Sequence, residues 1–344
     1  MSPAWVPVDG SRARSALASL AAISPYFEAD VLDANEHPAP TASASDVEHA
    51  RFEPVAVAEL NSGGAALAAA VDGVNERLGG VERRVAASTL ALGHAARLWS
   101  VALGTWATSG IVPDLDPAVL RVQPRLTAPL RLIVDRPAGW RPAPAASAAP
   151  RTPAASAAPG TPAASAAPGT PAASAAPGTP ATPTTAAPTL ATPTWPAVQA
   201  DGHLEAADLI REVIVERNLR PYFAAVRAET GLALGLLWGN AASALVGATG
   251  MLIRFLRTQP NKASTAPATA TAARPARACA EATAAGIGRL TARLLATPPL
   301  AGTTVHSLTP DGQLVVPSVV RRSCCLFYRV PGGGTCGDCP LDRP

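Results

Sequence analysis

The stretch Gly231–Ile253, GLALGLLWGNAASALVGATGMLI, carries no charged residue over 23 positions and is the most apolar part of this 344-residue chain. Its length meets the criterion for a membrane-spanning helix. Five glycines, Asn240 and Ser243 dilute its hydrophobicity, however, and Trp238 stands in the middle rather than at a membrane interface. We therefore expect the buried helix of a soluble domain, with no transmembrane span.

Further helices are predicted on both sides of this stretch. Apolar residues recur at helical spacing, and residues that cap or break helices bound each segment. The expected helices cover residues 12–22 (capped by Ser11), 63–78, 81–108, 201–220 (broken near Pro221), 222–228 and 286–295, with a loop over 258–276. A strand is expected over 130–134, and a hairpin over 304–308 and 314–320 around Pro310-Asp311-Gly312. The predicted fold class is α+β, predominantly α-helical, with a small β-hairpin.

The charge balance argues against one class of partner. The chain has 28 Lys and Arg against 25 Asp and Glu, a formal net charge of +3. This gives no basic surface of the kind that nucleic-acid binding needs, so we expect no nucleic-acid partner. The first residues lack the basic and apolar regions of a signal peptide, so we expect a cytoplasmic protein, with peripheral membrane association left open.

Residues 145–180 consist of four nine-residue units, AASAAPRTP once and AASAAPGTP three times. Each unit holds two prolines and no large apolar side chain, so it has nothing to bury in a core. We interpret residues 143–198 as a disordered or partly extended insert. It would separate an N-terminal part of the domain, residues 1–142, from a helical C-terminal part, residues 199–320, which leads into a cysteine-rich segment, residues 321–344.

Four of the five cysteines, Cys324, Cys325, Cys336 and Cys339, fall within the last 21 residues. In a reducing compartment such a group indicates a metal site before it indicates disulfides. The Cys336-x-x-Cys339 turn lets two thiolates converge on one metal while backbone N–H groups point at the sulfurs, as in many zinc and iron–sulfur sites. Cys279 stands alone among small residues and is expected to be a free thiol.

The adjacent pair Cys324-Cys325 departs from the spaced pairs of zinc ribbons. Successive side chains of a strand point to opposite faces, so both thiolates reach one site only if the backbone kinks there, or if each serves a different iron. The pair therefore favours a 2Fe-2S cluster over structural zinc. A zinc-stapled structural or partner-binding module stays open as the alternative, and two disulfides are a third possibility that the expected compartment disfavours.

Glycines and arginines surround the cysteines. Gly332–Gly334 would let the loop take positive φ and bring its amides close to sulfur, or would simply form a flexible tip. Arg321, Arg322 and Arg329 would offset the negative charge of a cluster, raise its reduction potential and dock an acidic electron donor, or would be solvated surface charges.

Residues 321–341, RRSCCLFYRVPGGGTCGDCPL, resemble the C-terminal 2Fe-2S signature of the FhuF-like ferric siderophore reductases. Residues 236–243, LLWGNAAS, and residues 96–100, ARLWS, with 110–113, GIVP, are also similar to that family. The insert and the first 80 residues depart from the family pattern.

The resemblance implies a 2Fe-2S cluster held by Cys324, Cys325, Cys336 and Cys339. It also implies an oxidoreductase of iron uptake, which reduces ferric hydroxamate-type siderophores by one-electron transfer in the cytoplasm and releases ferrous iron. The electron donor would be a ferredoxin or a flavoprotein. Electron transfer needs no protein acid, base or nucleophile, so we assign no catalytic residue, and His94 and His306 receive structural roles. Trp238 and Asn240 would line a substrate or electron path, or would only pack between helices.

Overall fold

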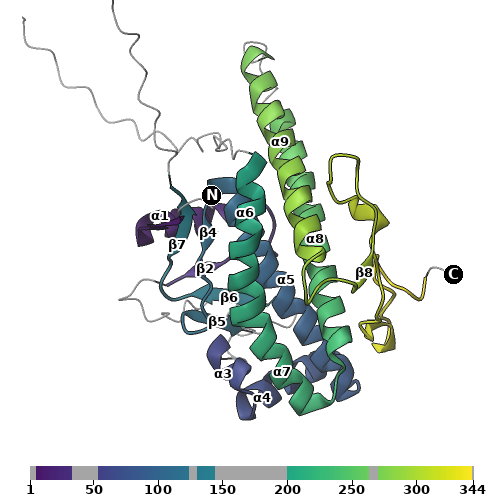
Figure 1. Cartoon of the computed structure of the whole chain (residues 1–344). Helices are drawn as coiled ribbons and strands as arrows, with labels where there is room; N and C mark the ends of the chain where they lie inside the picture. The colour runs from purple at the N-terminus through teal and green to yellow at the C-terminus, as the bar shows by residue number, and fades with distance from the viewer. Residues whose placement is uncertain (1–4, 33–52, 124–129, 144–199, 263–269, 343–344) are drawn as a thin grey trace, which may run out of the picture. The chain divides into compact units, whose positions relative to one another are not determined.

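The computed structural model describes residues 5–32, 53–123, 130–143, 200–262 and 270–342 (Figure 1). The predicted insert, apart from Ala143, lies outside this described part of the chain. Residues before and after the insert belong to one unit of the fold, which comprises Met1–Ala143 and Thr194–Pro344.

Four long helical segments pack side by side in Figure 1. They are α5 (Arg83–Ser109), α8 (Leu234–Lys262), α9 (Ala270–Leu295) and a continuous segment made of α6 (Ala200–Arg211), the π-helical η2 (Glu212–Leu219) and α7 (Arg220–Thr230). Helix α8 packs against α5 and α9, α9 packs against α6, and α7 packs against α5. The contacts therefore close a helical bundle, and the predicted α+β, mainly helical class is confirmed.

Helix α8 contains the apolar stretch with which the prediction began. Leu237, Ala241, Leu245 and Leu252 on this helix are fully buried. Among the described residues it is the one helix that is long and apolar enough to cross a membrane, over Leu234–Thr258, and most of this stretch is buried inside the protein. Burial of this kind is typical of a helix at the centre of a bundle.

The expected helix over residues 81–108 is confirmed as α5. Trp99 and Trp106 are among its largest fully buried side chains. The helix ends at Gly110, which has a φ of 66° and donates its N–H to the carbonyl of Trp106. Glycine adopts this left-handed conformation at little cost, which explains why the helix stops there.

Small sheets and short helices cover the N-terminal side of the bundle. One sheet has the antiparallel order β1 (Trp5–Val8), β7 (Gly139–Pro142), β4 (Val112–Pro113). A second has the order β2 (Asp30–Val31), β6 (Arg131–Val134), β5 (Leu120–Gln123), β3 (Val55–Ala56), in which only β2 and β6 pair in parallel. The short helices are α1 (Gly10–Ala18), η1 (Ser19–Ala22), α3 (Val57–Ser62) and α4 (Ala65–Arg77). The predictions included β6, α1 and α4 but missed the other strands. Of these, β2, β3 and β4 have two residues each, which is too short to show an alternating pattern.

The predicted cap and break positions need correction. Asp9, not Ser11, caps α1: the Asp9 carboxylate accepts hydrogen bonds from the Arg12 N–H at 2.9 Å and from the Ser11 hydroxyl at 2.6 Å. Pro221 does not break its helix either. A proline ring crowds the carbonyl four residues earlier and offers no N–H for the helix. The helix continues because the turn before Pro221 widens into the π-helical η2, where the Arg220 N–H donates to the carbonyl of Val215.

The expected loop over residues 258–276 was wrong over 258–262 and 270–276, and residues 263–269 lie outside the described residues. Helix α8 continues to Lys262 and α9 begins at Ala270, well before the predicted start at Gly286. Alanine, which dominates residues 270–284, is the best helix former, and this propensity outweighs the effect of Pro275.

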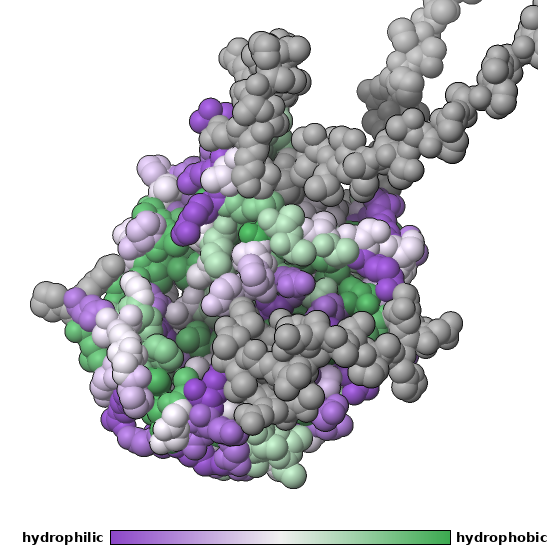
Figure 2. All heavy atoms as spheres, turned by 180° about the vertical axis from the view of Figure 1, so that it is seen from behind, coloured by the Kyte–Doolittle hydropathy of each residue, from purple (hydrophilic) through white to green (hydrophobic). Residues whose placement is uncertain are grey.

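The C-terminal segment lies along the side of the bundle formed by α5 and α8. Strands β8 (Thr304–Val305) and β9 (Val320–Arg321) pair antiparallel, and Leu308 bridges to Leu314. The predicted hairpin is therefore present, with shorter strands. The segment also contains two short 3-10 helices. The first, η4 (Val316–Ser318), precedes β9 and packs with it on α8, and the second, η5 (Phe327–Arg329), follows β9 and packs on α5. Figure 2 shows the molecule from behind Figure 1, where apolar and polar residues alternate over the surface.

Candidate iron–sulfur site

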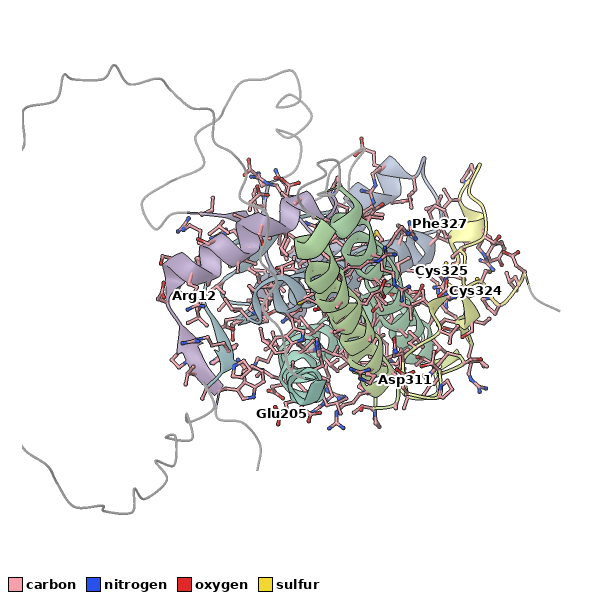
Figure 3. All side chains as sticks on the ribbon, turned by 90° about the horizontal axis from the view of Figure 1, so that it is seen from above. Arg12, Glu205, Asp311, Cys324, Cys325 and Phe327 are labelled. Carbon is pink, nitrogen blue, oxygen red and sulfur yellow. The ribbon has the colours of Figure 1, made fainter. Side chains whose placement is uncertain are left out.

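The four clustered cysteines meet in one corner of the C-terminal segment. The Sγ atoms of Cys325 and Cys336 lie 3.1 Å apart. Burial raises the pKa of Cys324, and the nearby Cys325 and Cys339 raise it further. Cys325 and Cys339 are buried, whereas Cys324 and Cys336 are half-buried. Figure 3 shows Cys324 and Cys325 on the C-terminal segment, on the opposite side of the molecule from Arg12.

The backbone kinks directly after the adjacent pair. Leu326 has a φ of 69° and is the only non-glycine residue in the described ranges with positive φ. This turn directs the Leu326 N–H to the Sγ of Cys324, at 3.3 Å, and the Phe327 N–H to the Sγ of Cys325, at 3.5 Å. The left-handed conformation costs a leucine on the order of 1–2 kcal/mol, and strain of this kind is common at functional sites. The kink expected at the pair therefore falls one residue later.

The second pair forms the predicted C-x-x-C turn. The Cys339 N–H donates to the carbonyl of Cys336 at 2.9 Å, and the Leu341 N–H donates to the Sγ of Cys339 at 3.4 Å. The Arg321 N–H donates to the carbonyl of Asp338 at 3.0 Å and so fixes the turn against β9. Three of the four sulfurs thus accept a backbone hydrogen bond.

A buried arginine contacts the fourth sulfur. The Nη2 of Arg321 donates to the Sγ of Cys336 at 2.7 Å, and the Nη1 donates to the Oδ1 of Asn240 at 3.0 Å. Its Nε lies 3.3 Å from the Oδ2 of Asp338, an ion pair without hydrogen-bond geometry. Burial alone would lower the pKa of Arg321, but Asp338, Cys325 and Cys336 raise it above its ordinary value. The guanidinium therefore stays charged beside the sulfurs.

Two helices of the bundle complete this network. The Nδ2 of Asn240, on α8, donates to the carbonyl and hydroxyl oxygens of Ser88, on α5, both at 3.0 Å. The Ser88 hydroxyl in turn donates to the carbonyl of Cys325 at 2.6 Å. We call Ser88, Asn240, Arg321 and Asp338 the Arg321 network. It gives Asn240 a definite role, and Ser88 and Asp338 are members that the sequence did not single out.

The glycine next to Asn240 permits the close approach of the C-terminal segment. A Cβ at Gly239 would lie 2.1 Å from the Oγ of Ser323, the residue before the adjacent cysteines. A side chain at this position would displace the Ser323 hydroxyl, which donates to the carbonyl of Gly235 at 3.2 Å. Trp238 does not reach the cysteines by any described contact; it packs edge-on against Phe223, with ring centroids 4.8 Å apart.

The expectation for the triple glycine was only partly correct. Gly332 has positive φ, at 71°, but Gly333 and Gly334 do not. Gly333 is needed for space, because a Cβ there would lie 2.8 Å from the carbonyl oxygen of Val330. The backbone donors to sulfur in the described part of the chain belong to Leu326, Phe327 and Leu341 rather than to glycine.

The three arginines also differ from one another. Only Arg321 contacts a sulfur, and its burial prevents it from docking a donor protein. Arg322 is exposed. Arg329 is exposed, with its Nη1 2.9 Å from the Glu82 carboxylate and its guanidinium 5.7 Å from the centre of the Tyr328 ring.

The other residues that the sequence singled out contact the protein itself and not the four clustered cysteines. His94 is buried in the bundle against Tyr222, with ring centroids 4.5 Å apart. His306 shares a hydrogen bond with the Thr304 hydroxyl at 3.1 Å. Cys279 lies on α9, and its carbonyl accepts a hydrogen bond from the Thr283 hydroxyl at 2.9 Å.

The four clustered thiols are arranged without a metal in this structure. Among the described residues, no group of three or more His, Cys, Asp or Glu side chains is gathered around a single ion position. A 2Fe-2S cluster requires only two of four thiolates at each iron. Burial raises the pKa of Cys324, and burial together with the contact to Cys325 raises the pKa of Cys336 to about 12. These thiols hold their protons without metal, so metal binding must release them.

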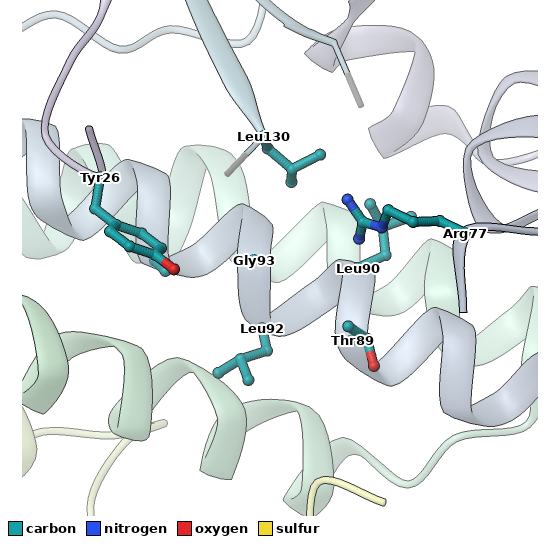
Figure 4. A pocket seen from close by; sticks show the side chains of 8 residues that line it. Tyr26, Arg77, Thr89, Leu90, Leu92, Gly93 and Leu130 are labelled. Atoms are coloured by element: carbon teal, nitrogen blue, oxygen red, sulfur yellow. The ribbon is translucent and has the colours of Figure 1, made fainter. Parts of the chain in front are cut away.

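Two cavities differ in their relation to the cysteines. An apolar cavity of about 280 Å³ opens beside α5, with Tyr26, Arg77 and Leu130 among its lining residues (Figure 4). No cysteine lines it. A groove of about 420 Å³ lies between α8 and the C-terminal segment, and Cys336 and Asp338 form part of its wall.

Comparison with known proteins agrees with this chemistry. Residues 321–341 match the FhuF 2Fe-2S C-terminal domain, a range that begins at the buried arginine and contains all four cysteines. No curated protein and no solved structure matches the chain. The last part of the chain is therefore a FhuF-type 2Fe-2S C-terminal domain, and the cofactor that this domain indicates is a 2Fe-2S cluster.

Proposed function

We propose that this protein is a ferric siderophore reductase of the cytoplasm. It takes one electron from a donor protein and delivers it to iron(III) in a hydroxamate-type chelate. The observation that carries the proposal is the meeting of four cysteines at a half-exposed corner, with the charged Arg321 on one sulfur. We propose Cys324, Cys325, Cys336 and Cys339 as the ligands of the cluster.

The chemistry of the substrate explains why one electron is enough. Hydroxamates hold iron(III) through hard oxygen donors, and the same oxygens bind the softer, less charged iron(II) far more weakly. The donor loses one electron, iron(III) gains it, and the freed hydroxamate oxygens take protons from water. When bound, a 2Fe-2S cluster supplies single-electron chemistry of this kind.

The residues around the sulfurs set the electrostatics of the site. Arg321 is held in place by Asn240 and Asp338, and its positive charge lies against Cys336. A positive charge at a sulfur ligand favours the reduced, more negative state and raises the reduction potential. The half-exposed Cys324 and Cys336 leave the site accessible from the surface, so the chelate need not enter the core.

We further propose an acidic donor, a ferredoxin or a flavoprotein, that docks over the exposed Arg322. Charge complementarity would speed its association in a salt-dependent way. The variant Arg322→Glu should slow donor-driven reduction of the protein at low salt. Arg12→Glu is the matched control, because Arg12 lies far from the cysteines (Figure 3). Equal rates for both variants would contradict this docking site.

A single-turnover experiment tests the main proposal. The protein is purified without oxygen, reduced, freed of excess reductant and mixed with a ferric trihydroxamate and a chromogenic trap for iron(II). We expect two irons and acid-labile sulfide in each chain, and about one iron(II) released for each cluster oxidised. Zinc in place of iron would support the zinc-stapled module, and a reduced cluster that leaves the chelate intact would refute the reductase.

A further inference from the structure

The groove beside Cys336 has the size of a ligand site. Its volume of about 420 Å³ falls in the range of small-molecule pockets, roughly 300–1,000 Å³. One wall is the C-x-x-C turn, with Cys336, Gly337 and Asp338, and the other wall is α8. A molecule in this groove therefore lies directly against one of the four clustered cysteines. The cavity of Figure 4 has no such neighbour.

Small residues on α8 keep the groove open along this helix. Ser243, Gly247 and Gly250 follow one another at spacings of four and three residues, which places them on one face of the helix. A Cβ at Gly247 would meet no atom within 4 Å, so the space above it belongs to the groove. Glycine inside a helix costs about 1 kcal/mol relative to alanine. No neighbouring atom of the protein requires a glycine at position 247, because an alanine side chain would fit there without a clash.

The lining combines apolar walls with one cation. Val246, Met251 and Val319 supply apolar surface, and Arg254 is the basic residue of the lining. Arg254 is exposed and forms no ion pair with another residue of the described ranges. The acidic residue of the groove, Asp338, already faces the buried Arg321. The groove thus presents the uncompensated positive charge of Arg254 to a ligand.

We infer that this groove binds the ferric hydroxamate chelate itself, with its hydrocarbon arms against the valines and methionine and an oxygen-rich or anionic edge toward Arg254. The inference rests on the proposed function and adds the binding site and the preferred charge of the substrate. A neutral or anionic trihydroxamate should bind more tightly than a cationic one, because Arg254 repels a positive chelate.

Gallium(III) complexes separate binding from reduction, since gallium(III) has the charge and size of iron(III) but is not reduced under these conditions. Calorimetry on the anaerobic holoprotein would compare one linear trihydroxamate with its terminal amine free, acetylated or succinylated, each loaded with gallium. We expect at least tenfold tighter binding of the succinylated complex than of the free amine. Arg254→Gln should remove this preference. Arg257→Gln should keep it, because Arg257, one helical turn after Arg254, pairs with Glu281.

Filling the groove gives an independent test. Gly247→Trp should weaken gallium-chelate binding at least tenfold and slow reduction of the ferric chelate to a similar extent. Gly247→Ala adds one methyl group in open space and should change neither. The cluster spectrum and the rate of oxidation by hexacyanoferrate(III), which needs no groove, should be the same in all three proteins and would show that the tryptophan variant is folded.

The outcomes distinguish this inference from the function on which it rests. Normal chelate binding and reduction in Gly247→Trp would overturn the groove but leave the reductase standing. Binding that depends on the groove, without any reduction of the ferric chelate by the wild type, would overturn the reductase alone. Loss of donor-driven reduction with unchanged gallium-chelate binding would show that the groove receives the donor protein and would overturn our assignment.

Discussion

The Nη2 of Arg321 donates a hydrogen bond to the Sγ of Cys336 at 2.7 Å, from a side chain that is fully shielded from solvent. A charged donor in a low-dielectric setting acts on its acceptor much more strongly than the same donor in water. The reduction potential of a cluster bound by these cysteines should therefore depend on Asn240 and Asp338, which hold Arg321 in place.

Replacing Arg321 should lower the reduction potential of the cluster. Arg321→Gln removes the positive charge that stabilises the reduced state, and a redox titration followed by electron paramagnetic resonance would measure the change. The same variant leaves the half-buried Asp338 without its ion-pair partner. Removing the negative charge of Asp338 raises the potential, so the double variant Arg321→Gln/Asp338→Asn should lie between Arg321→Gln and the wild type. An unchanged potential in an iron-replete Arg321→Gln variant would contradict the assigned role.

Each of the four clustered cysteines should be needed for the cluster. Cys324→Ser, Cys325→Ser, Cys336→Ser and Cys339→Ser each replace a soft thiolate ligand, so the visible absorption and the iron content should fall. Cys279→Ser is the matched control, because Cys279 lies on α9 and should not bind iron. Full absorption in any of the four variants, or its loss in the control, would show that the ligand set is wrong.

Ser88 should contribute more to stability than a second buried serine of the same helix. Ser88→Ala removes a donor from the Cys325 carbonyl and an acceptor from Asn240. Leaving such groups unpaired costs about 1–3 kcal/mol. The hydroxyl of Ser100, also buried on α5, has no described partner, so Ser100→Ala should not lower the free energy of unfolding. Chemical denaturation measures both, and equal losses would count against the network.

His94 should make the protein less stable in mild acid. Burial lowers the pKa of His94 from 6.5 to about 4, so the unfolded chain binds its proton first as the pH falls. The stabilising effect is complete above pH 6.5 and is lost progressively toward pH 4; at pH 5 the loss is roughly 2 kcal/mol.

The variant His94→Phe isolates this contribution. Both ring nitrogens of His94 lack hydrogen-bond partners in the described structure, and phenylalanine retains the ring contact with Tyr222. The loss of unfolding free energy between pH 7 and pH 5 should therefore be smaller in the variant, with the remainder including the effect of His203, whose pKa is also about 4. Identical pH dependence in both proteins would show that His94 is not the responsible group.

The long helices and the cysteine pairs could be predicted because their signals are local. Helix α5 repeats apolar residues at helical spacing over 27 residues, and the four cysteines lie within one short segment. The two-residue strands β2, β3 and β4 offered no such repeat, since partners elsewhere in the chain define them. The same is true of Ser88, which meets Cys325 across 237 positions, and of Asn240, which meets Arg321 across 81.

The sequence by itself determined the mainly helical fold and the cluster chemistry, because helical periodicity and thiolate spacing act between near neighbours. Only the tertiary structure decided which of three arginines faces the sulfurs. Arg321 is the last residue of β9 and turns inward between α8 and the C-x-x-C turn, whereas Arg322, directly after the strand, faces solvent. The groove at Cys336 arose in the same way, from the packing of two segments that are distant in sequence.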